Sequence, residues 1–237
     1  MNYLIDNLSL IIPTKNDHLR IKENLEENIE FLKTNIKNFE ILIVSNGSTI
    51  ESSAFIDELI KRYKFIQHIN IIPSGKGLAI KKGLVNSKFD TALFMDADSS
   101  VKISEFKKFV ENKQLKSPFV IGNRKNNLSR NIGSPFLRKL SGYIYLKIVK
   151  TVFNVDLEDT QCGFKAIDKS RFSTYLNFHT DGFSFDMELI LLAKKENINT
   201  LEIPVIYIHN TDSKVKVYVD TFKMLKDLIR IKKNLNL

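Results

Sequence analysis

Short runs of apolar residues alternate along the chain with segments in which apolar residues recur every three or four positions. The run Leu-Ser-Leu-Ile-Ile at 8–12 is followed by helical spacing over 18–36, and the run at 39–44 by helical spacing over 56–63. Short apolar runs are typical of strands buried on both faces, and the recurring spacing is typical of amphipathic helices. The pattern therefore predicts strands that alternate with helices from the start of the chain.

The same pattern continues to the C-terminus. It predicts strands at 8–12, 39–44, 65–72, 91–96, 118–122, 161–167 and 200–208, and helices at 18–36, 56–63, 75–85, 104–111, 136–153, 183–196 and 217–234. Strands that alternate with helices at short spacing form a parallel sheet with right-handed crossovers. We expect one α/β domain over 1–237, with a doubly wound, mostly parallel sheet, helices on both faces and an amphipathic C-terminal helix at about 217–234.

The predicted strand that starts at Thr91 runs through uncharged residues directly into Asp96 and Asp98. Because side chains alternate along a strand, these two carboxylates are expected on the same side. Open α/β sheets bind their ligands at the carboxyl ends of strands. Two unpaired carboxylates favour a cation, and oxygen ligands favour Mg²⁺ or Mn²⁺, which usually carries a substrate diphosphate. The alternative is a strand end with two solvated Asp residues, because Asp-x-Asp alone is common.

Basic residues in two further regions are candidates for phosphate binding. The Gly-Lys-Gly run at 75–77 opens a predicted helix, where backbone N–H groups and Lys76 can bind phosphate. It is neither a Walker A loop nor a Rossmann fingerprint, and a glycine-rich turn into a helix is the alternative. Arg124 and Arg138 lie where few acids are available to pair with them, and Arg suits bidentate phosphate binding. Arg130 in the same region is interpreted as a solvated residue.

Acidic pairs follow in the second half of the chain. Glu158 and Asp159 precede Gly163 in a predicted loop. Paired acids can orient an acceptor or act as a base, although many such pairs are only loop acids. Asp186 and Glu188 stand two positions apart on a predicted helix, so they point in different directions and at most one is expected to face a site. Another acid, Asp17, precedes the helix at 18–36, and we expect it to cap that helix.

Composition narrows the class of protein. The chain has 237 residues, 43% of them hydrophobic, a net charge of +9 and a single cysteine, Cys162. One cysteine cannot form an internal disulfide, which favours a reducing compartment, and the four scattered histidines give no zinc pattern. There is no nucleic-acid-binding signature, no apolar stretch long enough to span a membrane and no signal-peptide pattern. The basic charge is compatible with phosphorylated substrates or an anionic membrane surface.

Short motifs are spread over nearly the whole chain in a definite order. They are Ile11-Ile-Pro-Thr14, Asn46-Gly-Ser48, Gly75-Lys-Gly-x-Ala79 with Gly83, Met95-Asp-Ala-Asp98, Ile121-Gly-Asn-Arg124, Asp159-Thr-Gln-Cys-Gly-Phe-Lys165, Phe185-Asp-Met-Glu-Leu189, Ile203-Pro-Val205 and Ser213-Lys-Val215. In this order they resemble the family 2 glycosyltransferases of the GT-A fold. Within that family the chain is similar to the polyprenyl-phosphate sugar synthases, and to the dolichyl-phosphate β-glucosyltransferases more than to the mannose synthases. The run from Asp159 to Lys165 is the most specific motif.

The resemblance implies roles for residues at matching positions. It implies that the donor nucleotide sugar is held by Pro13, Thr14, Asn16, Asp17, Ser45, Asn46, Gly47, Lys76, Asp96, Ala97, Asp98, Ser213 and Lys214. It implies catalytic roles for Asp96, Asp98, Asp159, Arg124 and Arg138, a Mg²⁺ or Mn²⁺ ion on Asp98 and Asp96, and an acceptor phosphate on Arg124, Arg138 and Ser141. The resemblance leaves the nucleotide of the donor open between UDP and GDP. Ser45 stands where the family has Asp, and Lys15 and Asp17 replace the usual Tyr and Glu.

The reaction that the resemblance implies is inverting transfer of a sugar, with glucose from UDP-glucose favoured, to a polyprenyl phosphate. A phosphate is already ionised near neutral pH and hardly needs a base, whereas a sugar hydroxyl would need Asp159 to deprotonate it. The alternatives are a family 2 enzyme that uses GDP-mannose or a cell-surface polysaccharide acceptor, and a non-catalytic nucleotide-sugar-binding homologue. A sugar-nucleotide pyrophosphorylase is disfavoured because its first loop is glycine-rich, whereas this loop reads Pro-Thr-Lys-Asn-Asp at 13–17.

A lipid acceptor also implies contact with a membrane. The segments predicted as helical at 217–234 and 143–153 combine apolar and basic residues. Helices at anionic membrane interfaces have this composition, and so do helices that cover a protein's own core. We expect a peripheral protein at the cytoplasmic face of a membrane, with no nucleic-acid partner, and the sequence leaves the oligomeric state open.

Overall fold

The computed structural model of the protein describes residues 3–133, 135–210 and 217–235, and the side chains of 136–139 and 217–222 lie outside this description. Its helices are α1 (His18–Asn35), α2 (Ile50–Ile60), α3 (Lys76–Asn86), the 3₁₀ helix η1 (Ile103–Phe109), α4 (Phe136–Phe153), α5 (Phe185–Lys195) and α6 (Val217–Asn234). Its strands are β1 (Ile5–Thr14), β2 (Ile36–Asn46), β3 (Ile66–Ile71), β4 (Thr91–Phe94), β5 (Val110–Glu111), β6 (Gln114–Leu115), β7 (Phe119–Asn123), β8 (Arg130–Ile132), β9 (Lys165–Asp168), β10 (Thr200–Pro204) and β11 (Ile206–Ile208).

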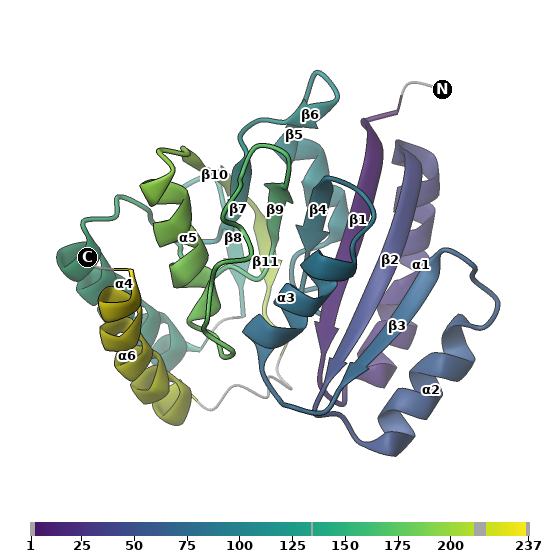
Figure 1. Cartoon of the computed structure of the whole chain (residues 1–237), viewed down its shortest axis with the longest axis horizontal. Helices are drawn as coiled ribbons and strands as arrows, with labels where there is room; N and C mark the ends of the chain where they lie inside the picture. Colours follow the sequence, from purple (N-terminus) through teal and green to yellow (C-terminus); the bar gives the residue numbers. More distant parts are fainter. Residues whose placement is uncertain (1–2, 134, 211–216, 236–237) are drawn as a thin grey trace.

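Among the described residues, a seven-stranded sheet runs in the order β10-β7-β9-β4-β1-β2-β3 (Figure 1). β1 pairs in parallel with β2 and β4, β2 with β3, and β7 with β10. β9 lies between β4 and β7 and is antiparallel to both. The mostly parallel α/β sheet is therefore confirmed, and β9 departs from it.

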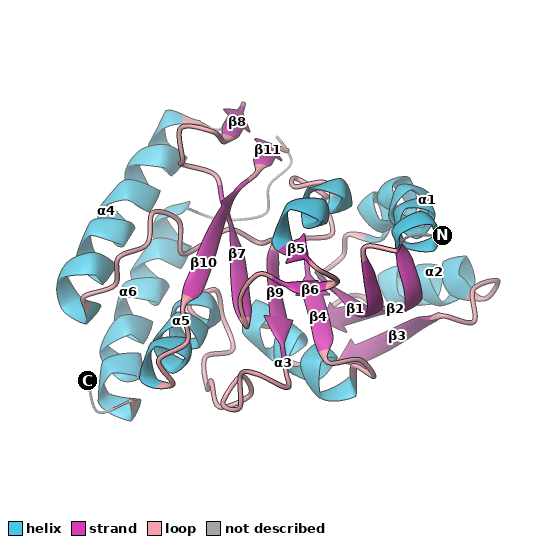
Figure 2. Cartoon of the chain, turned by 90° about the horizontal axis from the view of Figure 1, so that it is seen from above, coloured by secondary structure: helices cyan, strands magenta, loops and turns pink. Residues whose placement is uncertain are grey.

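Helices cover both faces of the sheet because its central strands are apolar on both sides. In β1, Leu8, Leu10 and Ile12 cluster with residues of α1, α2 and η1, whereas Ile11 clusters on the opposite face with residues of α3 and α5. Figure 1 shows α3 and α5 in front of the sheet, and Figure 2 shows α4 and α6 side by side near β10. The expected arrangement of helices on both faces is confirmed.

Some predicted elements differ from the structure. The segment 104–111 forms η1 and the start of the short β5–β6 pair instead of one longer helix. The strand predicted at 161–167 begins only at Lys165, because the Asp159 carboxylate accepts the N–H of Gln161 (3.2 Å) and holds the chain in a turn. The strand predicted at 200–208 is interrupted after Pro204, and β11 pairs with β8 in a separate sheet.

The predicted C-terminal helix is present as α6, and it covers the core. Leu228, Ile231 and Leu235 are buried in the same cluster as residues of α5. The exposed side of α6 carries basic residues such as Lys223 and Arg230. Within the described part of the chain, no helix is both long enough and apolar enough to cross a membrane.

Candidate active site

The carboxyl ends of β1, β2, β3 and β4 lie at one edge of the sheet, which we call the donor edge. Thr14 pairs with Ser45 across β1 and β2, and Asn46 pairs with Ile71 across β2 and β3. This edge and the loops that leave it hold most of the predicted donor-binding residues: Pro13, Thr14, Asn16, Asp17, Ser45, Asn46, Gly47, Lys76, Asp96, Ala97 and Asp98. The strand order brings these residues together, as expected for a parallel sheet.

Asn46 joins three of these loops. Its Nδ2 donates to the carbonyl oxygen of Thr14 (2.8 Å), and its Oδ1 accepts the N–H of Gly75 (3.0 Å). Asn46 is buried. Its amide therefore fixes the spacing between the loops that follow β1, β2 and β3.

The loop after β1 turns through Asn16, which has a positive φ of 55°. The N–H of Asn16 donates to Ser48 Oγ (3.2 Å), and Asn16 Oδ1 accepts the N–H of Thr49 (2.8 Å). Asp17 occupies the N-cap position of α1, but its side chain makes no capping hydrogen bond. Its carboxylate instead accepts a hydrogen bond from Arg20 (3.2 Å). The expected Asp17 cap is therefore wrong, and Asn16 holds the loop.

The hydroxyl of Ser45 belongs to a chain of polar side chains beside the donor edge. Ser45 Oγ is 2.7 Å from His68 Nε2, and His68 Nδ1 is 2.7 Å from Asp57 Oδ1 on α2. Ser45 is fully buried, whereas the Asp57 side chain is largely exposed. These three hydrogen-bonded side chains link the end of β2 to solvent beside α2. A contact between Ser45 and a nucleotide base stays a prediction.

Asp96 and Asp98 lie in a turn after β4 instead of on the strand. β4 ends at Phe94, the N–H of Ser99 donates to the carbonyl oxygen of Asp96 (3.1 Å), and Ser99 has a positive φ of 48°. Asp98 Oδ1 accepts the N–H of Ser100 (3.0 Å). The prediction that both residues lie on the strand is therefore wrong, and the alternation argument does not apply to them, because it holds only for extended chain.

Lys76 at the start of α3 reaches this acidic turn. Its Nζ is 2.6 Å from Asp96 Oδ1. Burial opposes the charge of Lys76, but the charges of Asp96 and Asp186 outweigh burial and raise the pKa of Lys76 above its usual range. Lys76 therefore stays cationic and balances the carboxylates of the turn.

The glycines beside Lys76 allow close packing. A Cβ on Gly75 would lie 2.5 Å from the carbonyl oxygen of Asp181, and a Cβ on Gly77 would lie 2.2 Å from that of Thr180. The Asp181 carbonyl also accepts a backbone N–H from the first turn of α3 (3.2 Å). The run at 75–77 is therefore a tight turn into a helix, and phosphate binding by Lys76 stays a prediction.

Gly163 contacts the carboxylate of Asp96. A Cβ at Gly163 would lie 2.0 Å from Asp96 Oδ2, so only glycine leaves that carboxylate in place. Gly163 belongs to the run that starts at Asp159, in the loop before β9. The turn after β4 and the loop before β9 therefore meet at this contact.

Arg124 and Asp159 form an ion pair that defines a second part of the site, the acceptor region. Arg124 Nε donates to Asp159 Oδ2 (2.7 Å), Nη2 donates to Oδ1 (2.8 Å), and the backbone N–H of Arg124 donates to Oδ2 (3.0 Å). The side chain of Asp159 is 1% exposed and that of Arg124 is 18% exposed. The guanidinium carbon of Arg124 lies 5.3 Å from the centre of the Tyr207 ring. Charge, hydrogen bonds and stacking together fix the guanidinium.

The ion pair keeps Asp159 ionised. Burial alone would raise the pKa of Asp159, but the charge and hydrogen bonds of Arg124 outweigh burial and lower the pKa to about 2. A carboxylate with so low a pKa, whose two oxygens already accept hydrogen bonds, is a weak base. Asp159 is suited to orienting Arg124 and poorly suited to removing a proton.

The other predicted site residues are less fully described. Ser141 lies on α4 and is half-buried. Arg138 is also on α4, but its side chain lies outside the described part of the chain, and Ser213 and Lys214 lie outside it entirely. The roles of these residues stay predictions.

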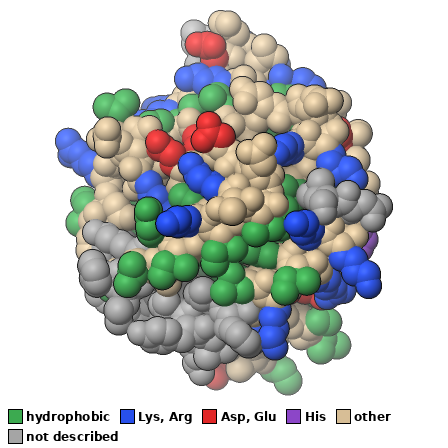
Figure 3. All heavy atoms as spheres, turned by 90° about the vertical axis from the view of Figure 1, so that its left-hand side faces the viewer, with side chains coloured by type: hydrophobic (Ala, Val, Ile, Leu, Met, Phe, Trp, Pro, Cys, Tyr) green, Lys and Arg blue, Asp and Glu red, His purple; other side chains and the backbone are tan. Residues whose placement is uncertain are grey.

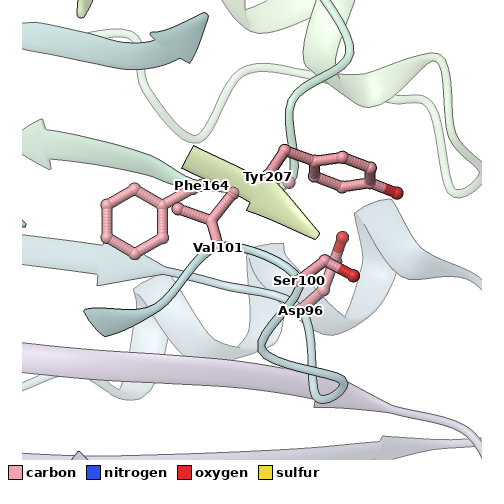
Figure 4. Close-up of a pocket in the computed structure, with 6 residues that line it drawn as sticks. Asp96, Ser100, Val101, Phe164 and Tyr207 are labelled. Atoms are coloured by element: carbon pink, nitrogen blue, oxygen red, sulfur yellow. The ribbon is translucent and has the colours of Figure 1, made fainter. Parts of the chain in front are cut away.

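A small pocket lies where the donor edge meets the acceptor region. It is lined by Asp96, Ser100, Val101, Gly163, Phe164 and Tyr207. Figure 4 shows Asp96 and Tyr207 near one end of this pocket, with the ring of Phe164 at the other. Because Asp96 contacts Lys76 and Tyr207 lies against Arg124, the pocket joins the two parts of the site.

Most of the chain, residues 9–174, matches glycosyl transferase family 2. The chain belongs to this family. Among its relatives is a dolichyl-phosphate beta-glucosyltransferase of Trichomonas vaginalis, 32% identical over 94% of this chain and 72% of the relative. The dolichyl-phosphate beta-glucosyltransferase of Saccharomyces cerevisiae is 30% identical over 95% of this chain and 74% of the relative. The expected family and the expected class of enzyme, a glycosyltransferase, are confirmed.

The fold of this family 2 glycosyltransferase matches solved structures of GT-A enzymes. The mannosyl-3-phosphoglycerate synthase from Rubrobacter xylanophilus has a TM-score of 0.71 at 14% identity, covering 96% of this chain and 74% of that one. The glucosyl-3-phosphoglycerate synthase from Mycobacterium tuberculosis, solved with Mn²⁺, UDP-glucose and phosphoglyceric acid, has a TM-score of 0.69 at 13% identity, covering 95% and 79%. At these identities the likeness shows the fold alone, and it confirms the expected GT-A fold.

Three residues of this glycosyltransferase lie close to the site without having been predicted there: Lys165, Glu202 and Tyr207. Lys165 Nζ is 2.6 Å from Asp186 Oδ1, and both residues are buried. Glu202 accepts backbone N–H groups from the loop that carries Asp159. A charged residue within the apolar run Phe-Lys-Ala-Ile was an available signal for Lys165. Glu202 and Tyr207 belong to no motif, and they lie in the mostly apolar segment 200–208.

The two acids of α5 contact different partners, as their spacing predicted. Asp186 pairs with Lys165. Glu188 Oε2 accepts hydrogen bonds from the N–H (2.9 Å) and the hydroxyl (2.6 Å) of Thr180. Because Thr180 packs on Gly77, Glu188 anchors the loop against which α3 begins.

The carboxylates present in the turn after β4 fit a divalent cation. Asp96 and Asp98 offer hard oxygen ligands, and Mg²⁺ is commonly held by one or two carboxylates together with substrate phosphates. In the described segments, no cluster of three or more His, Cys, Asp or Glu side chains forms a complete protein cage. The ammonium of Lys76 at 2.6 Å from Asp96 shows that the turn attracts positive charge. The donor set therefore suits an ion that also carries a diphosphate.

Proposed function

We propose that this glycosyltransferase transfers glucose from UDP-glucose to a polyprenyl phosphate, with inversion at the anomeric carbon. The observation that carries the proposal is the ion pair of Arg124 and Asp159, with distances of 2.7 and 2.8 Å. The pair leaves Asp159 poorly suited to deprotonate a sugar hydroxyl, and it presents a fixed guanidinium to an anion. An acceptor that is already ionised fits both features.

The names of the relatives support the same sugar and acceptor. The relatives from Trichomonas vaginalis and Saccharomyces cerevisiae are named dolichyl-phosphate beta-glucosyltransferases, and dolichyl phosphate is a polyprenyl-type phosphate. A structural neighbour from Mycobacterium tuberculosis was solved with UDP-glucose. These names favour UDP-glucose over GDP-mannose as the donor.

In the proposed reaction, an acceptor phosphate oxygen bonds to the anomeric carbon while the bond from that carbon to the diphosphate breaks, and UDP leaves from the opposite face. Negative charge grows on the leaving diphosphate, and Lys76 at the start of α3 supplies positive charge there. Arg124 holds the acceptor phosphate with the N–H groups that Asp159 does not accept. Alignment of the two reactants, more than proton removal, supplies the rate.

The donor edge completes the proposal. Asp96 and Asp98 would hold Mg²⁺ or Mn²⁺, which when bound neutralises charge on the leaving diphosphate. Gly163 leaves room for the Asp96 carboxylate, and Asn46 keeps the loops at their spacing. Further contacts are proposed for residues of which less is described: Arg138 and Ser141 to the acceptor phosphate, and Ser213 and Lys214 to the diphosphate.

α4 supplies the surface by which the enzyme would meet a membrane that contains a lipid acceptor. Leu140, Tyr143 and Ile144 are all exposed and, at three- and four-residue spacing, lie on one side of this helix with Lys147. Figure 3 shows the side of the molecule that bears α4 and α6, where hydrophobic side chains lie among Lys and Arg. Both helices bury apolar residues in the core, but among the described side chains α4 exposes several large apolar residues on one side and α6 exposes only Ile229, so α4 is the better candidate of the two predicted helices.

Peripheral contact through α4 is tested by sedimentation with vesicles that contain anionic lipid. The double variant Tyr143→Ser/Ile144→Ser is expected to bind less well than the unaltered chain, because it removes exposed apolar area beside Lys147. Val85→Ser is the matched control, since Val85 is an exposed apolar residue on α3. Equal binding by all three proteins would contradict the role of α4.

The proposed reaction is tested by following labelled sugar from UDP-glucose, and in parallel from GDP-mannose, to a polyprenyl phosphate with Mg²⁺ or Mn²⁺. We expect product from UDP-glucose and none from Asp98→Ala. Product from GDP-mannose alone would overturn the donor. UDP binding without transfer to the lipid would favour a polysaccharide acceptor or a non-catalytic homologue, which a parallel assay with polysaccharide and an assay of donor hydrolysis would separate.

A further inference from the structure

The carboxylate of Glu202 bridges two consecutive peptide groups of the loop that carries Asp159. The N–H of Glu158 donates to Glu202 Oε2 and the N–H of Asp159 donates to Glu202 Oε1, both at 2.8 Å. Glu202 lies on β10, where it pairs with Ile121 of β7, the strand that leads into Arg124. One side chain therefore ties this loop to the strands beside it.

The bridge lies directly behind the ion pair of the acceptor region. Glu202 holds the backbone of Asp159, and the carboxylate of Asp159 accepts three hydrogen bonds from Arg124, at 2.7, 2.8 and 3.0 Å. A movement of the Asp159 peptide would therefore be passed to the guanidinium. Glu158 is held as well, since its Oε2 accepts from Asn123 Nδ2 (2.8 Å).

A second bridge of the same kind provides an internal comparison. Glu196 lies just after α5, at the opposite end of that helix from Asp186. Its Oε2 accepts the N–H of Ser173 (3.1 Å), and its Oε1 accepts the N–H of Thr174 (2.5 Å). Glu196 and Glu202 are both half-buried, and each carboxylate accepts two consecutive backbone N–H groups.

The two carboxyl groups differ in their electrostatic surroundings. Burial raises the pKa of both, but at Glu196 the hydrogen bonds outweigh burial and the pKa is lowered. At Glu202, burial together with the charges of Asp159 and Glu158 leaves the pKa raised despite two similar hydrogen bonds. Glu202 thus places a third carboxylate beside those of Asp159 and Glu158.

We propose that Glu202 is a positioning residue for transfer: it holds the peptide of Asp159 so that Asp159 aims Arg124 at the acceptor phosphate. The inference rests on the proposed function only in taking the acceptor to be a phosphate. Glu202 acts through Asp159 and Arg124.

The test compares Glu202→Gln with Glu196→Gln. Glutamine keeps the shape of the side chain, but its amide nitrogen cannot accept, so one of the two bridged N–H groups loses its partner. Both variants lose one such hydrogen bond, but Glu202→Gln also removes a charge that the carboxylates of Asp159 and Glu158 repel. Tm is therefore expected to fall less in Glu202→Gln than in Glu196→Gln. The Km for polyprenyl phosphate is expected to rise about tenfold in Glu202→Gln alone, with UDP affinity unchanged, because only that variant frees the Arg124 pair.

A second readout does not depend on the reaction. Arg124 is modified with phenylglyoxal, and the extent of reaction at this residue is followed by peptide mass spectrometry. We expect faster modification in Glu202→Gln than in the unaltered chain, and no change in Glu196→Gln. Equal modification of Arg124 in the two variants would overturn the inference, and so would an equal acceptor Km in an enzyme that transfers.

The two proposals fail in different ways. If the unaltered chain transfers no sugar to polyprenyl phosphate while Glu202→Gln still exposes Arg124 selectively, the proposed acceptor is wrong and the positioning role of Glu202 stands. If the unaltered chain transfers normally and Glu202→Gln behaves like Glu196→Gln, the positioning role is wrong and the proposed reaction stands.

Discussion

At the donor edge, Asn46 links neighbouring loops through hydrogen bonds between neutral groups, at 2.8 and 3.0 Å. In the acceptor region, Arg124 and Asp159 are joined as buried charges, and Lys165 and Asp186 form a second buried pair behind the site. A neutral hydrogen bond contributes about 1 kcal/mol to stability, whereas removing one partner of a buried ion pair costs about 3–5 kcal/mol. The difference implies that these buried ion pairs tolerate substitution less than the Asn46 links at the donor edge do.

The contrast follows from the topology of the sheet. Parallel strands deliver their loops to one edge, so the side chain of Asn46 is long enough to link neighbouring loops at the donor edge. The loop that carries Asp159 leads into β9, which is antiparallel to β4 and β7 and so reaches the site from another direction. Gly163 touches Asp96 where these two routes meet. The buried Arg124–Asp159 ion pair fixes the loop that carries Asp159, because charged groups attract one another more strongly than neutral groups when water is excluded.

The largest expected effect is on stability, from Lys165→Met. This change leaves the Asp186 carboxylate buried without its partner, and we expect a loss of about 3–5 kcal/mol in the free energy of unfolding, measured by urea denaturation. The double variant Lys165→Met/Asp186→Leu removes both charges and should recover most of that loss. A double variant no more stable than the single one would show that the pair does not act as a unit.

The next effect is on rate, from Gly163→Ala. The added Cβ would lie 2.0 Å from Asp96 Oδ2, so the carboxylate must move, and we expect transfer to fall about 100-fold. Gly182→Ala is the control, because its Cβ would meet no atom closer than Asp227 Oδ2 at 4.0 Å. Similar transfer rates for the two variants would show that the contact between Gly163 and Asp96 is not needed for activity.

Much of the donor edge was predictable from the sequence. Apolar runs followed by polar loops placed Asp96, Asp98 and Asn46 at the ends of parallel strands, and parallel strands share an edge. The pattern could not show that the chain turns immediately after Phe94, since an apolar run does not mark where a strand ends. The prediction that both carboxylates lie on the strand failed for that reason.

Less of the acceptor region was predictable. Arg124 and Asp159 are far apart in the chain, and each was interpreted as a ligand or base before the structure showed that they bind each other. Glu202 carries no motif, and its role depends on a contact with backbone N–H groups that sequence does not reveal. Which charged residues pair over long distances in the chain depends on the antiparallel placement of β9 between β4 and β7. The spacing of residues within one segment carries no information about that placement.

A smaller effect is expected at the donor edge. Asn46→Ala removes two neutral hydrogen bonds, to Thr14 and Gly75, and we expect a loss of about 2 kcal/mol in the free energy of unfolding together with weaker UDP binding. Urea denaturation and titration with UDP measure the two quantities. A loss as large as that of Lys165→Met would break the contrast between neutral and charged links.

The smallest expected effect is of pH on the acceptor region. The pKa of Asp159 is lowered to about 2 from an ordinary 3.8, so its stabilising effect is complete above the ordinary value and is lost only as the pH falls toward the lowered one. With both substrates saturating, we expect no limb in kcat from Asp159 between about pH 5 and about pH 8. An acidic limb in that interval that disappears in Asp159→Asn would identify this carboxylate as a base after all.

In the proposed reaction, the acceptor is an ionised phosphate held by Arg124, and Asp159 is the ion-pair partner of Arg124. The most direct measurement offers the enzyme labelled UDP-glucose with either a polyprenyl phosphate or the polyprenol of the same length. We predict glucosylated lipid from the phosphate and none from the alcohol, because the Arg124–Asp159 pair offers an anion site and no free base. Transfer to the alcohol at a comparable rate would contradict this proposal. An alcohol must lose its proton to a base, and Asp159, held by Arg124, is poorly suited to remove it.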